Sequence, residues 1–363
     1  MSDPGESERR WRQDLRAGVA RPADLERLPL DAADRSVATL YKVRVPASQL
    51  ERIDWSDPDD PIRRQLLPSA EELTVLPGEL EDPIGDEAHS PVPRVTHRYP
   101  DRALLYPTYV CSAYCRHCFR KQTLNDQGTG FSMAALEPAL DYFARTPALR
   151  EVILTGGDPL TLSDDQLRSL RERLEAIPHL RMIRVHSRIP VTLPTRVTPG
   201  LVAALSGRLM TAVVTHFNHP REIGPEAIEA CRLLRTAGFM LLNQTVLLAG
   251  VNDEVETMKT LCQELVYALG AKPYYLHHCD LTRGVSHFRT SIDAGLELVR
   301  ALRGHVSGLC QPTYVLDLPG GAGKVPLGPG FVREREGHDW QFSTYDGETV
   351  DYREVLRPDP DES

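Results

Sequence analysis

The chain lacks the apolar segments that carry proteins into or across membranes. No apolar run in its 363 residues approaches the ~20 residues that span a bilayer, and the N-terminal stretch MSDPGESERRWRQ has no apolar signal core. These absences predict a cytoplasmic protein without a membrane partner.

Cysteine is also scarce, and positive charges are outnumbered by negative ones. The chain has seven cysteines, three of them close together and four scattered at positions 231, 262, 279 and 310, which fits a reduced compartment better than a disulfide framework. The net charge of -9 argues against nucleic acid as the main partner. What is present is an ordinary soluble composition, with 41% hydrophobic and 26% charged residues.

The pattern along the chain predicts three regions. Residues 1–95 are rich in charge and proline, with amphipathic stretches around Trp11–Ala20 and Ala47–Trp55 and a turn or helix-start signal at 57–61. We expect a helical N-terminal region there, a core over 96–325 and a C-terminal tail over 326–363. The tail is polar, with a strand-like segment at 340–345 and an acidic end at 359–363.

In the core, short apolar runs alternate with segments of helical periodicity. Repeated strand–helix units predict an α/β fold with a parallel sheet, and six or seven units suit an incomplete barrel. Catalytic groups of such folds gather where strands end and loops begin. The predicted strands are 103–110, 151–155, 182–186, 211–217, 241–248, 273–278 and 313–318, and the predicted helices are 132–145, 164–176, 225–237, 254–269 and 292–303.

The most informative motif is Cys111-Ser-Ala-Tyr-Cys115-Arg-His-Cys118, which directly follows the first predicted strand. Three thiolates with this spacing can each bind a corner iron of a [4Fe-4S] cubane, which leaves one iron open for chemistry. The alternatives are three unrelated cysteines or a zinc knuckle that lacks a ligand. Zinc would need a fourth Cys or His at matched spacing, and His117 is poorly placed between two ligands.

Two glycine-rich segments follow predicted strands. Glycines in Thr155-Gly156-Gly157-Asp158-Pro159 let the backbone approach a ligand closely. Pro319-Gly-Gly-Ala-Gly-Lys324 ends in a lysine that could form an imine with pyridoxal phosphate (PLP), and Val325 rules out a Walker A motif. Taken alone, each segment could be a plain turn, and Lys324 a solvated surface lysine.

A series of short strings runs in order along the core and carries a family resemblance. They are Thr96-His-Arg-Tyr-Pro-Asp-Arg102, the cysteine loop with Phe119-Arg-Lys121, Gly156-Gly-Asp-Pro159, Ser187-Arg-Ile-Pro-Val191, Thr215-His-Phe-Asn-His-Pro220, Asn243-Gln244, Gly250-Val-Asn-Asp253, Pro273-Tyr-Tyr-Leu276, Cys279-Asp-Leu281, His287-Phe-Arg-Thr290 and Asp317-Leu-Pro-Gly-Gly-Ala-Gly-Lys324. The cysteine motif resembles that of the radical S-adenosylmethionine (SAM) superfamily. Over about 96–352 the strings together resemble lysine 2,3-aminomutase and its relatives.

The resemblance implies a fold, a reaction and site residues. The fold would be a partial (β/α)6-type radical SAM barrel, and the enzyme an isomerase that uses a [4Fe-4S] cluster, SAM and PLP to move an amino group from C2 to C3 of an amino acid. The implied site residues are Cys111, Cys115 and Cys118 for the cluster; Gly156, Gly157, Asp158, Ser187, His216 and Gln244 for SAM; Arg98, Arg102 and the catalytic Lys324 for PLP; and Arg120, Asp280 and Asp317 for the substrate.

Asp280 and Asp317 indicate the substrate class. Two carboxylates in one pocket raise each other's pKa unless a cation joins them, so a cationic side chain fits best. L-Lysine is the first choice, and L-arginine or a lysine carried by a partner protein are alternatives. A radical SAM enzyme of another reaction type and a noncatalytic iron–sulfur carrier are the alternatives from other classes.

The resemblance also bears on partners and metals. It implies an electron donor such as flavodoxin or ferredoxin and a homo-oligomer. The family's structural zinc is predicted absent, because no cysteine follows Cys310. Histidines without metal-ligand spacing are expected to have ordinary roles outside the site, namely His277, His278, His287, His305 and His338.

Overall fold

The computed structural model describes residues 4–126 and 130–354. The acidic end predicted at 359–363 lies outside the described residues. Within the described part, no helix is both long and apolar enough to cross a membrane.

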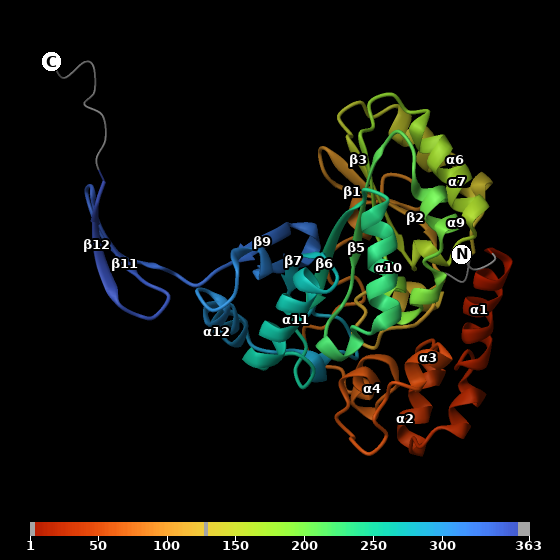
Figure 1. The fold of residues 1–363 in the computed structure, drawn as a ribbon, viewed down its shortest axis with the longest axis horizontal. Coiled ribbons are helices and arrows are strands. Elements are labelled where there is room, and N and C mark those ends of the chain that lie inside the picture. Colours follow the sequence, from red (N-terminus) through yellow and green to blue (C-terminus); the bar gives the residue numbers. More distant parts are fainter. Residues whose placement is uncertain (1–3, 127–129, 355–363) are drawn as a thin grey trace.

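A nine-stranded sheet curves through the centre of the molecule, with its strands in sequence order from β1 to β9 (Figure 1). Strands β2 to β8 run parallel, while β1 and β9 pair antiparallel with the two ends of that set. The predicted strands and partial barrel are confirmed. The bounds are β1 Val95–Tyr99, β2 Arg102–Thr108, β3 Glu151–Gly156, β4 Met182–His186, β5 Met210–Thr215, β6 Met240–Val246, β7 Lys272–His277, β8 Thr313–Leu318 and β9 Gly323–Leu327.

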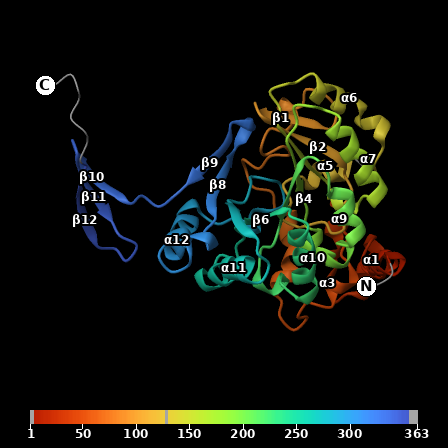
Figure 2. The same cartoon turned by 45° about the horizontal axis from the view of Figure 1, so that its top comes forward.

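Helices that connect the strands pack against the outside of this sheet (Figures 1 and 2). In α7, Leu167, Leu170 and Leu174 recur at helical spacing and are buried in the main core. The five predicted core helices are confirmed. The α-helices are α1 Pro4–Ala17, α2 Ala32–Ser36, α3 Ala47–Leu50, α4 Pro61–Leu66, α5 Lys121–Asp126, α6 Met133–Ala144, α7 Asp164–Glu175, α8 Ile189–Thr192, α9 Pro199–Leu205, α10 Pro225–Thr236, α11 Val255–Tyr267 and α12 Ile292–Leu302.

The N-terminal helices α1 to α4 lie at one end of the barrel (Figure 1). Their apolar cluster includes Val43, Ile62 and Leu66, and it also contains Ala113 of the cysteine loop. Asp60 caps α4 by accepting the N–H groups of Ile62 and Arg63, which confirms the helix-start signal at 57–61. The region is therefore packed directly behind the cysteine loop.

The C-terminal tail folds into a separate three-stranded antiparallel sheet of β10 (Val332–Glu336), β11 (Asp339–Ser343) and β12 (Thr349–Arg353). Both views show this sheet standing away from the barrel (Figures 1 and 2). The strand predicted at 340–345 corresponds to β11. The predicted domain boundaries stay predictions.

The sequence pattern does not predict strands β9 and β10, and each has a physical reason. Strand β9 reads Gly-Lys-Val-Pro-Leu, and glycine and proline are unfavourable in a strand interior, but β9 forms an edge that pairs only with β8. Strand β10 reads Val-Arg-Glu-Arg-Glu and is exposed along its whole length, so it has no buried face to mark it.

Candidate active site

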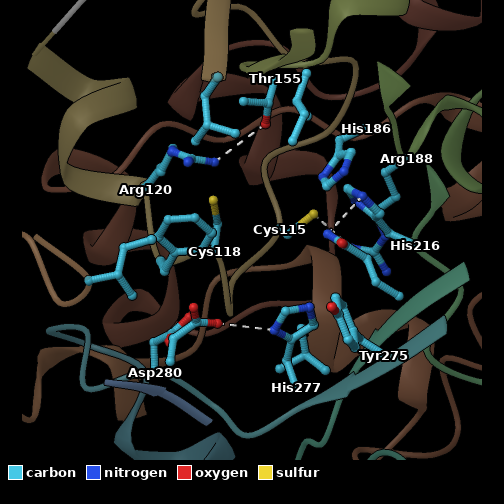
Figure 3. A pocket seen from close by; sticks show the side chains of 18 of the residues that line it. Cys115, Cys118, Arg120, Thr155, His186, Arg188, His216, Tyr275, His277 and Asp280 are labelled. Atoms are coloured by element: carbon cyan, nitrogen blue, oxygen red, sulfur yellow. Dashed lines mark hydrogen bonds and ion pairs between the residues drawn. The ribbon is translucent and has the colours of Figure 1, made fainter. Parts of the chain in front are cut away.

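A cavity of about 410 Å³ opens where the parallel strands end. Side chains from the cysteine loop and from several strands point into it (Figure 3). Carboxyl ends of parallel strands share one rim, which explains this convergence. Ser187 is the one predicted site residue that does not line the cavity; the others do, namely Arg98, Arg102, Cys111, Cys115, Cys118, Arg120, Gly156, Gly157, Asp158, His216, Gln244, Asp280, Asp317 and Lys324.

The cysteine loop follows β2 and is held from behind by the N-terminal region. Arg44 donates to the carbonyl oxygen of Cys111 over 3.0 Å. The buried carboxylate of Glu72 accepts from Arg116 at 2.6 Å and from Lys121 at 2.7 Å. Because a buried charge must keep its partners, these bonds fix the position of the loop.

Two of the three thiols resist ionisation in the folded chain. Burial and the neighbouring negative charges raise the pKa of Cys111 well above its ordinary value and that of Cys118 to about 11. Arg188 supplies a positive charge to the same loop, because its guanidinium donates to Cys115 Sγ over 2.7 Å (Figure 3). A cationic iron centre would stabilise the thiolates further, so these residues fit a cluster.

The arrangement differs from a single-ion site. Among residues 4–126 and 130–354, no group of three His, Cys, Asp or Glu side chains is placed to hold one metal ion. A cubane does not require such convergence, because each thiolate binds a different iron. The cysteine loop is therefore compatible with a cluster.

The glycine turn after β3 packs tightly against the cysteine loop. A Cβ atom on Gly157 would lie 2.5 Å from the carbonyl oxygen of Val110, and Gly156 has a φ of +99°. The N–H of Gly157 is taken by the carbonyl of Thr108 at 2.8 Å. Backbone packing thus requires both glycines. The turn can offer its carbonyl oxygens to the ammonium group of a ligand.

Asp158 and Ser187 bind each other. Ser187 donates to Asp158 over 2.7 Å, and Asp158 also accepts the N–H of Leu160 and of Arg188. Burial raises the pKa of Asp158 to about 6, while these hydrogen bonds favour its charged form. The pair ties the turn after β3 to the turn after β4, and the predicted SAM contacts of both residues stay predictions.

His216, just after β5, and Gln244, in β6, are joined at 3.1 Å through the ring Nε2 and the amide Nε2. An amide nitrogen can only donate, so the ring nitrogen is the acceptor. Burial, with a smaller effect of Arg188, lowers the pKa of His216 to about 3, and the ring is therefore neutral. The two side chains present an uncharged polar surface to the cavity.

Two arginines predicted to bind anions share a carboxylate that the sequence analysis missed. Asp86 accepts from Arg98 at 3.2 Å and from Arg120 at 3.0 Å. Tyr106 donates to Asp86 at 3.3 Å, and burial raises the pKa of this tyrosine to about 12, so it keeps its proton. Both arginines line the cavity, whereas Asp86 lies behind them and orients their guanidinium groups.

Arg102, the first residue of β2, also lines the cavity. It pairs with Asp101 at 2.7 Å, and its guanidinium lies 4.0 Å from the ring centroid of Tyr99. The hydroxyl of Tyr99 accepts the backbone N–H of Lys324 at 3.0 Å. Arg102 and Lys324 are therefore connected through one tyrosine.

The glycine-rich segment after β8 is a tight turn that places Lys324 opposite Asp317. Gly320 and Gly321 have φ values of +69° and +80°, a conformation that favours glycine. Strand β9 then runs back along β8 with Asp317 and Lys324 as directly paired residues. The Lys324 ammonium lies 2.5 and 2.6 Å from the two Asp317 oxygens, and the lysine side chain is 31% exposed.

Asp317 and Asp280 ionise differently. His277 Nδ1 bonds to Asp317 at 3.2 Å. Burial opposes the charge of Asp317, but this hydrogen bond and the Lys324 ammonium together lower its pKa well below the ordinary value. Burial and then the charge of Asp317 raise the pKa of Asp280 to about 7. At neutral pH one carboxyl is charged and the other half-protonated, so a second cation would favour full ionisation of the pair.

The structure corrects the role predicted for His277. This residue ends β7 and lines the cavity, as His186 does at the end of β4 (Figure 3). The Nε2 atoms of both rings and the Nε of Arg98 are buried without a hydrogen-bond partner. Buried polar atoms rarely lack one, so these atoms fit polar groups of bound cofactors or substrate. Polar residues that end parallel strands are the signal that would have found both histidines.

Comparison with known proteins agrees with this geometry. Family models described as Radical SAM superfamily and Lysine-2,3-aminomutase match residues 105–261 and 299–360. The L-lysine 2,3-aminomutase of Clostridium subterminale is 42% identical over 355 residues, which cover 96% of this chain and 85% of that protein. The L-lysine 2,3-aminomutase of Escherichia coli (strain K12) is 39% identical, and the alignment covers 87% of this chain and 94% of that protein. The glutamate 2,3-aminomutase of Clostridioides difficile (strain 630) is 38% identical over 87% of this chain and 74% of that protein.

These matches identify the type of enzyme and two of its cofactors. A radical SAM domain implies a [4Fe-4S] cluster and SAM, and the cysteine loop described above fits the cluster. The relatives are aminomutases, which are isomerases, and they differ in the charge of the amino acid in their names. The chain belongs to the lysine 2,3-aminomutase family of radical SAM isomerases.

Proposed function

We propose that the protein is a PLP-dependent 2,3-aminomutase that converts L-lysine to β-lysine. The observation that carries this proposal is the ammonium site at Asp317. Both oxygens of this carboxylate hold an ammonium group, that of Lys324, and Asp280 is close enough for the charge of Asp317 to raise its pKa. A pocket that holds one ammonium in this way is complementary to the ε-ammonium of a lysine substrate.

The same charges argue against an acidic substrate. A glutamate side chain would meet the charged carboxylate of Asp317, which is only 6% exposed and poorly screened by water. L-Arginine is the second candidate, because the two Asp317 oxygens can accept a guanidinium fork.

The remaining cavity residues suit the rest of an amino acid bound to PLP. Bound cluster and SAM would supply the initiating radical, and bound PLP would carry the migrating amino group. Arg120 would hold the substrate α-carboxylate, while Arg98 and Arg102 would hold the PLP phosphate, for which guanidinium groups are well suited. Lys324 would attach PLP to the chain. A low-potential reductant of the flavodoxin or ferredoxin class would start each reaction.

Turnover of four amino acids side by side tests the substrate. Anaerobically reconstituted protein with SAM, PLP and dithionite is expected to form the 3-amino isomer from L-lysine faster than from L-arginine, L-norleucine or L-glutamate, as measured by mass spectrometry. Faster turnover of L-arginine would transfer the assignment to arginine. A preference for L-glutamate or L-norleucine would contradict a cationic substrate.

The variant Lys324→Ala tests the PLP role. It should lose the absorbance of PLP bound to lysine and all rearrangement. Reductive cleavage of SAM should survive, because the cysteine loop and the turn at Gly156 are untouched. Lys259→Ala is the matched control, since Lys259 pairs with Glu256 on the outer helix α11. Full rearrangement by Lys324→Ala would overturn the assignment.

A further inference from the structure

We infer that Arg188 raises the reduction potential of the [4Fe-4S] cluster through its hydrogen bond to Cys115, and that Glu222 moderates this effect as the counter-charge of Arg188. Arg188 follows β4 and caps the start of α8, and the sequence analysis gave it no role. The inference goes beyond the proposed function, because it concerns the reduction of the cluster and does not depend on which amino acid is rearranged.

The contact between Arg188 and Cys115 joins a buried cation to a cluster sulfur. One guanidinium nitrogen of Arg188 donates to Cys115 Sγ over 2.7 Å (Figure 3). The Arg188 side chain is only 7% exposed, so water screens its charge poorly. Hydrogen bonds to the sulfurs, net charge and solvent exposure are among the factors that set the potential of an iron–sulfur cluster. Arg188 therefore acts on the cluster through both a hydrogen bond and a charge.

Other buried contacts fix the position of this guanidinium. The second terminal nitrogen of Arg188 donates to Gln65 Oε1 at 2.6 Å and to Glu222 Oε1 at 2.7 Å. The backbone N–H of Arg188 donates to Asp158 over 2.8 Å. Gln65 lies in α4, and its carbonyl oxygen accepts the backbone N–H of Arg116 in the cysteine loop. Arg188 cannot turn away from Cys115 without breaking buried, charged contacts, which is costly.

Glu222 opposes the charge of Arg188 from a fixed position. Its side chain is 3% exposed, and its second oxygen accepts the backbone N–H groups of Asn218 at 2.6 Å and His219 at 3.0 Å. A carboxylate held beside the guanidinium cancels part of the positive field that reaches Cys115. The pair thus contains one group that favours added negative charge on the cluster and one that disfavours it.

The two charges act on the transfer of one electron. A reductant of the flavodoxin or ferredoxin class loses that electron and is oxidised, and the cluster gains it and passes from the 2+ to the 1+ state. The thiolates stay bound to iron, and no proton moves in this step. The added negative charge is stabilised by a nearby cation and by an N–H donor to sulfur, and it is destabilised by a nearby carboxylate. Arg188 should therefore raise the potential, and Glu222 should lower it.

The experiment measures the potential of the cluster rather than turnover. Full-length protein is reconstituted anaerobically with iron and sulfide, SAM and PLP are withheld, and the electron paramagnetic resonance signal of the reduced cluster is recorded against the applied potential. Arg188→Met should lower the midpoint potential by about 59 mV or more, which is a tenfold change in the equilibrium constant of a one-electron couple. Glu222→Gln, which keeps the shape and removes the charge, should raise it. Arg188→Lys keeps the charge but lacks the guanidinium fork, so its potential should lie between those of the parent and Arg188→Met.

A second ion pair provides matched controls. Arg171 and Glu175 of the outer helix α7 are joined at 2.9 Å, and the Arg171 side chain is 5% exposed. Arg171→Met and Glu175→Gln remove the same chemical groups from a pair that does not contact the cysteine loop, and both should keep the parent potential. Iron content and thermal melting verify that each variant is folded and carries its cluster.

The sign of the two shifts separates a redox role from a structural one. General damage to the cysteine loop has no reason to move the potential in opposite directions for the two members of one ion pair. Parent potentials in cluster-containing Arg188→Met and Glu222→Gln would overturn the inference, and so would shifts of both in the same direction. If Arg188→Met fails to hold its cluster, Glu222→Gln decides: a raised potential supports the inference, and an unchanged or lowered potential overturns it.

Discussion

Replacing Asp317 with asparagine removes the charge on which a cationic substrate would depend. Asparagine keeps the size of the side chain and one acceptor oxygen. The site is buried, and it holds the Lys324 ammonium at 2.5 and 2.6 Å and the ring of His277 at 3.2 Å. The change therefore affects charge far more than shape.

The expected loss follows from the burial of this group and from its neighbour. Removing one member of a buried, hydrogen-bonded charge pair costs about 2–5 kcal/mol, equivalent to roughly thirty- to several-thousand-fold in binding. Asp280 should compensate in part, because the charge of Asp317 is one cause of its raised pKa. With that charge gone, Asp280 ionises more readily and attracts the substrate cation. We therefore expect the lower end of the range, about thirty- to a hundredfold.

The assay compares apparent KM values for L-lysine and L-norleucine in fully reconstituted enzyme. Asp317→Asn should raise the KM for L-lysine by that factor and change the KM for L-norleucine far less. Iron content should stay normal, since the cysteine loop is unchanged. Asp165→Asn is a matched control, because Asp165 is 90% exposed on α7 and pairs with Arg168.

A specific result would refute the reasoning. If Asp317→Asn and Asp280→Asn both use L-lysine as well as the parent does, these carboxyls do not hold the substrate side chain. An equal loss for L-lysine and L-norleucine would instead indicate general damage to the pocket.

Three further predictions concern the cluster, the pH dependence and the shared carboxylate. Reconstituted parent should carry about four irons per chain, and Cys115→Ala should lose SAM cleavage entirely. Normal SAM cleavage by this variant would contradict the assignment of Cys115 as a cluster ligand. The apparent KM for L-lysine should fall between about pH 6 and about pH 8, because Asp280 ionises near its raised pKa of about 7 and a cation binds the ionised form; a profile unchanged in Asp280→Asn would contradict this role. Asp86→Asn removes a charged acceptor from both Arg98 and Arg120, so PLP titration and the KM for amino acids should each weaken by roughly tenfold or more; parent-like values on both measurements would show that Asp86 does not position the arginines.

Local sequence determined the parts of this protein that depend on neighbours along the chain. The spacing of Cys111, Cys115 and Cys118 defines a cluster loop because all three thiols lie on one short segment. Apolar periodicity located the strands and helices of the parallel core, since each element must bury one face against the next. The short resembling strings then assigned site residues, and all of these except Ser187 line one cavity.

Tertiary structure alone decided how those residues work together. Asp86 comes from a loop of the N-terminal region and meets Arg98 and Arg120, and nothing in its own sequence context marks it. His277 acquires its place because it ends a strand of the barrel next to β8. The unequal pKa values of Asp280 and Asp317 depend on the register of β8 and β9, which sets the Lys324 ammonium on one carboxylate and not on the other. Sequence specifies which groups are present, whereas burial and the distances between charges, which determine their pKa values and partners, exist only once the chain has folded.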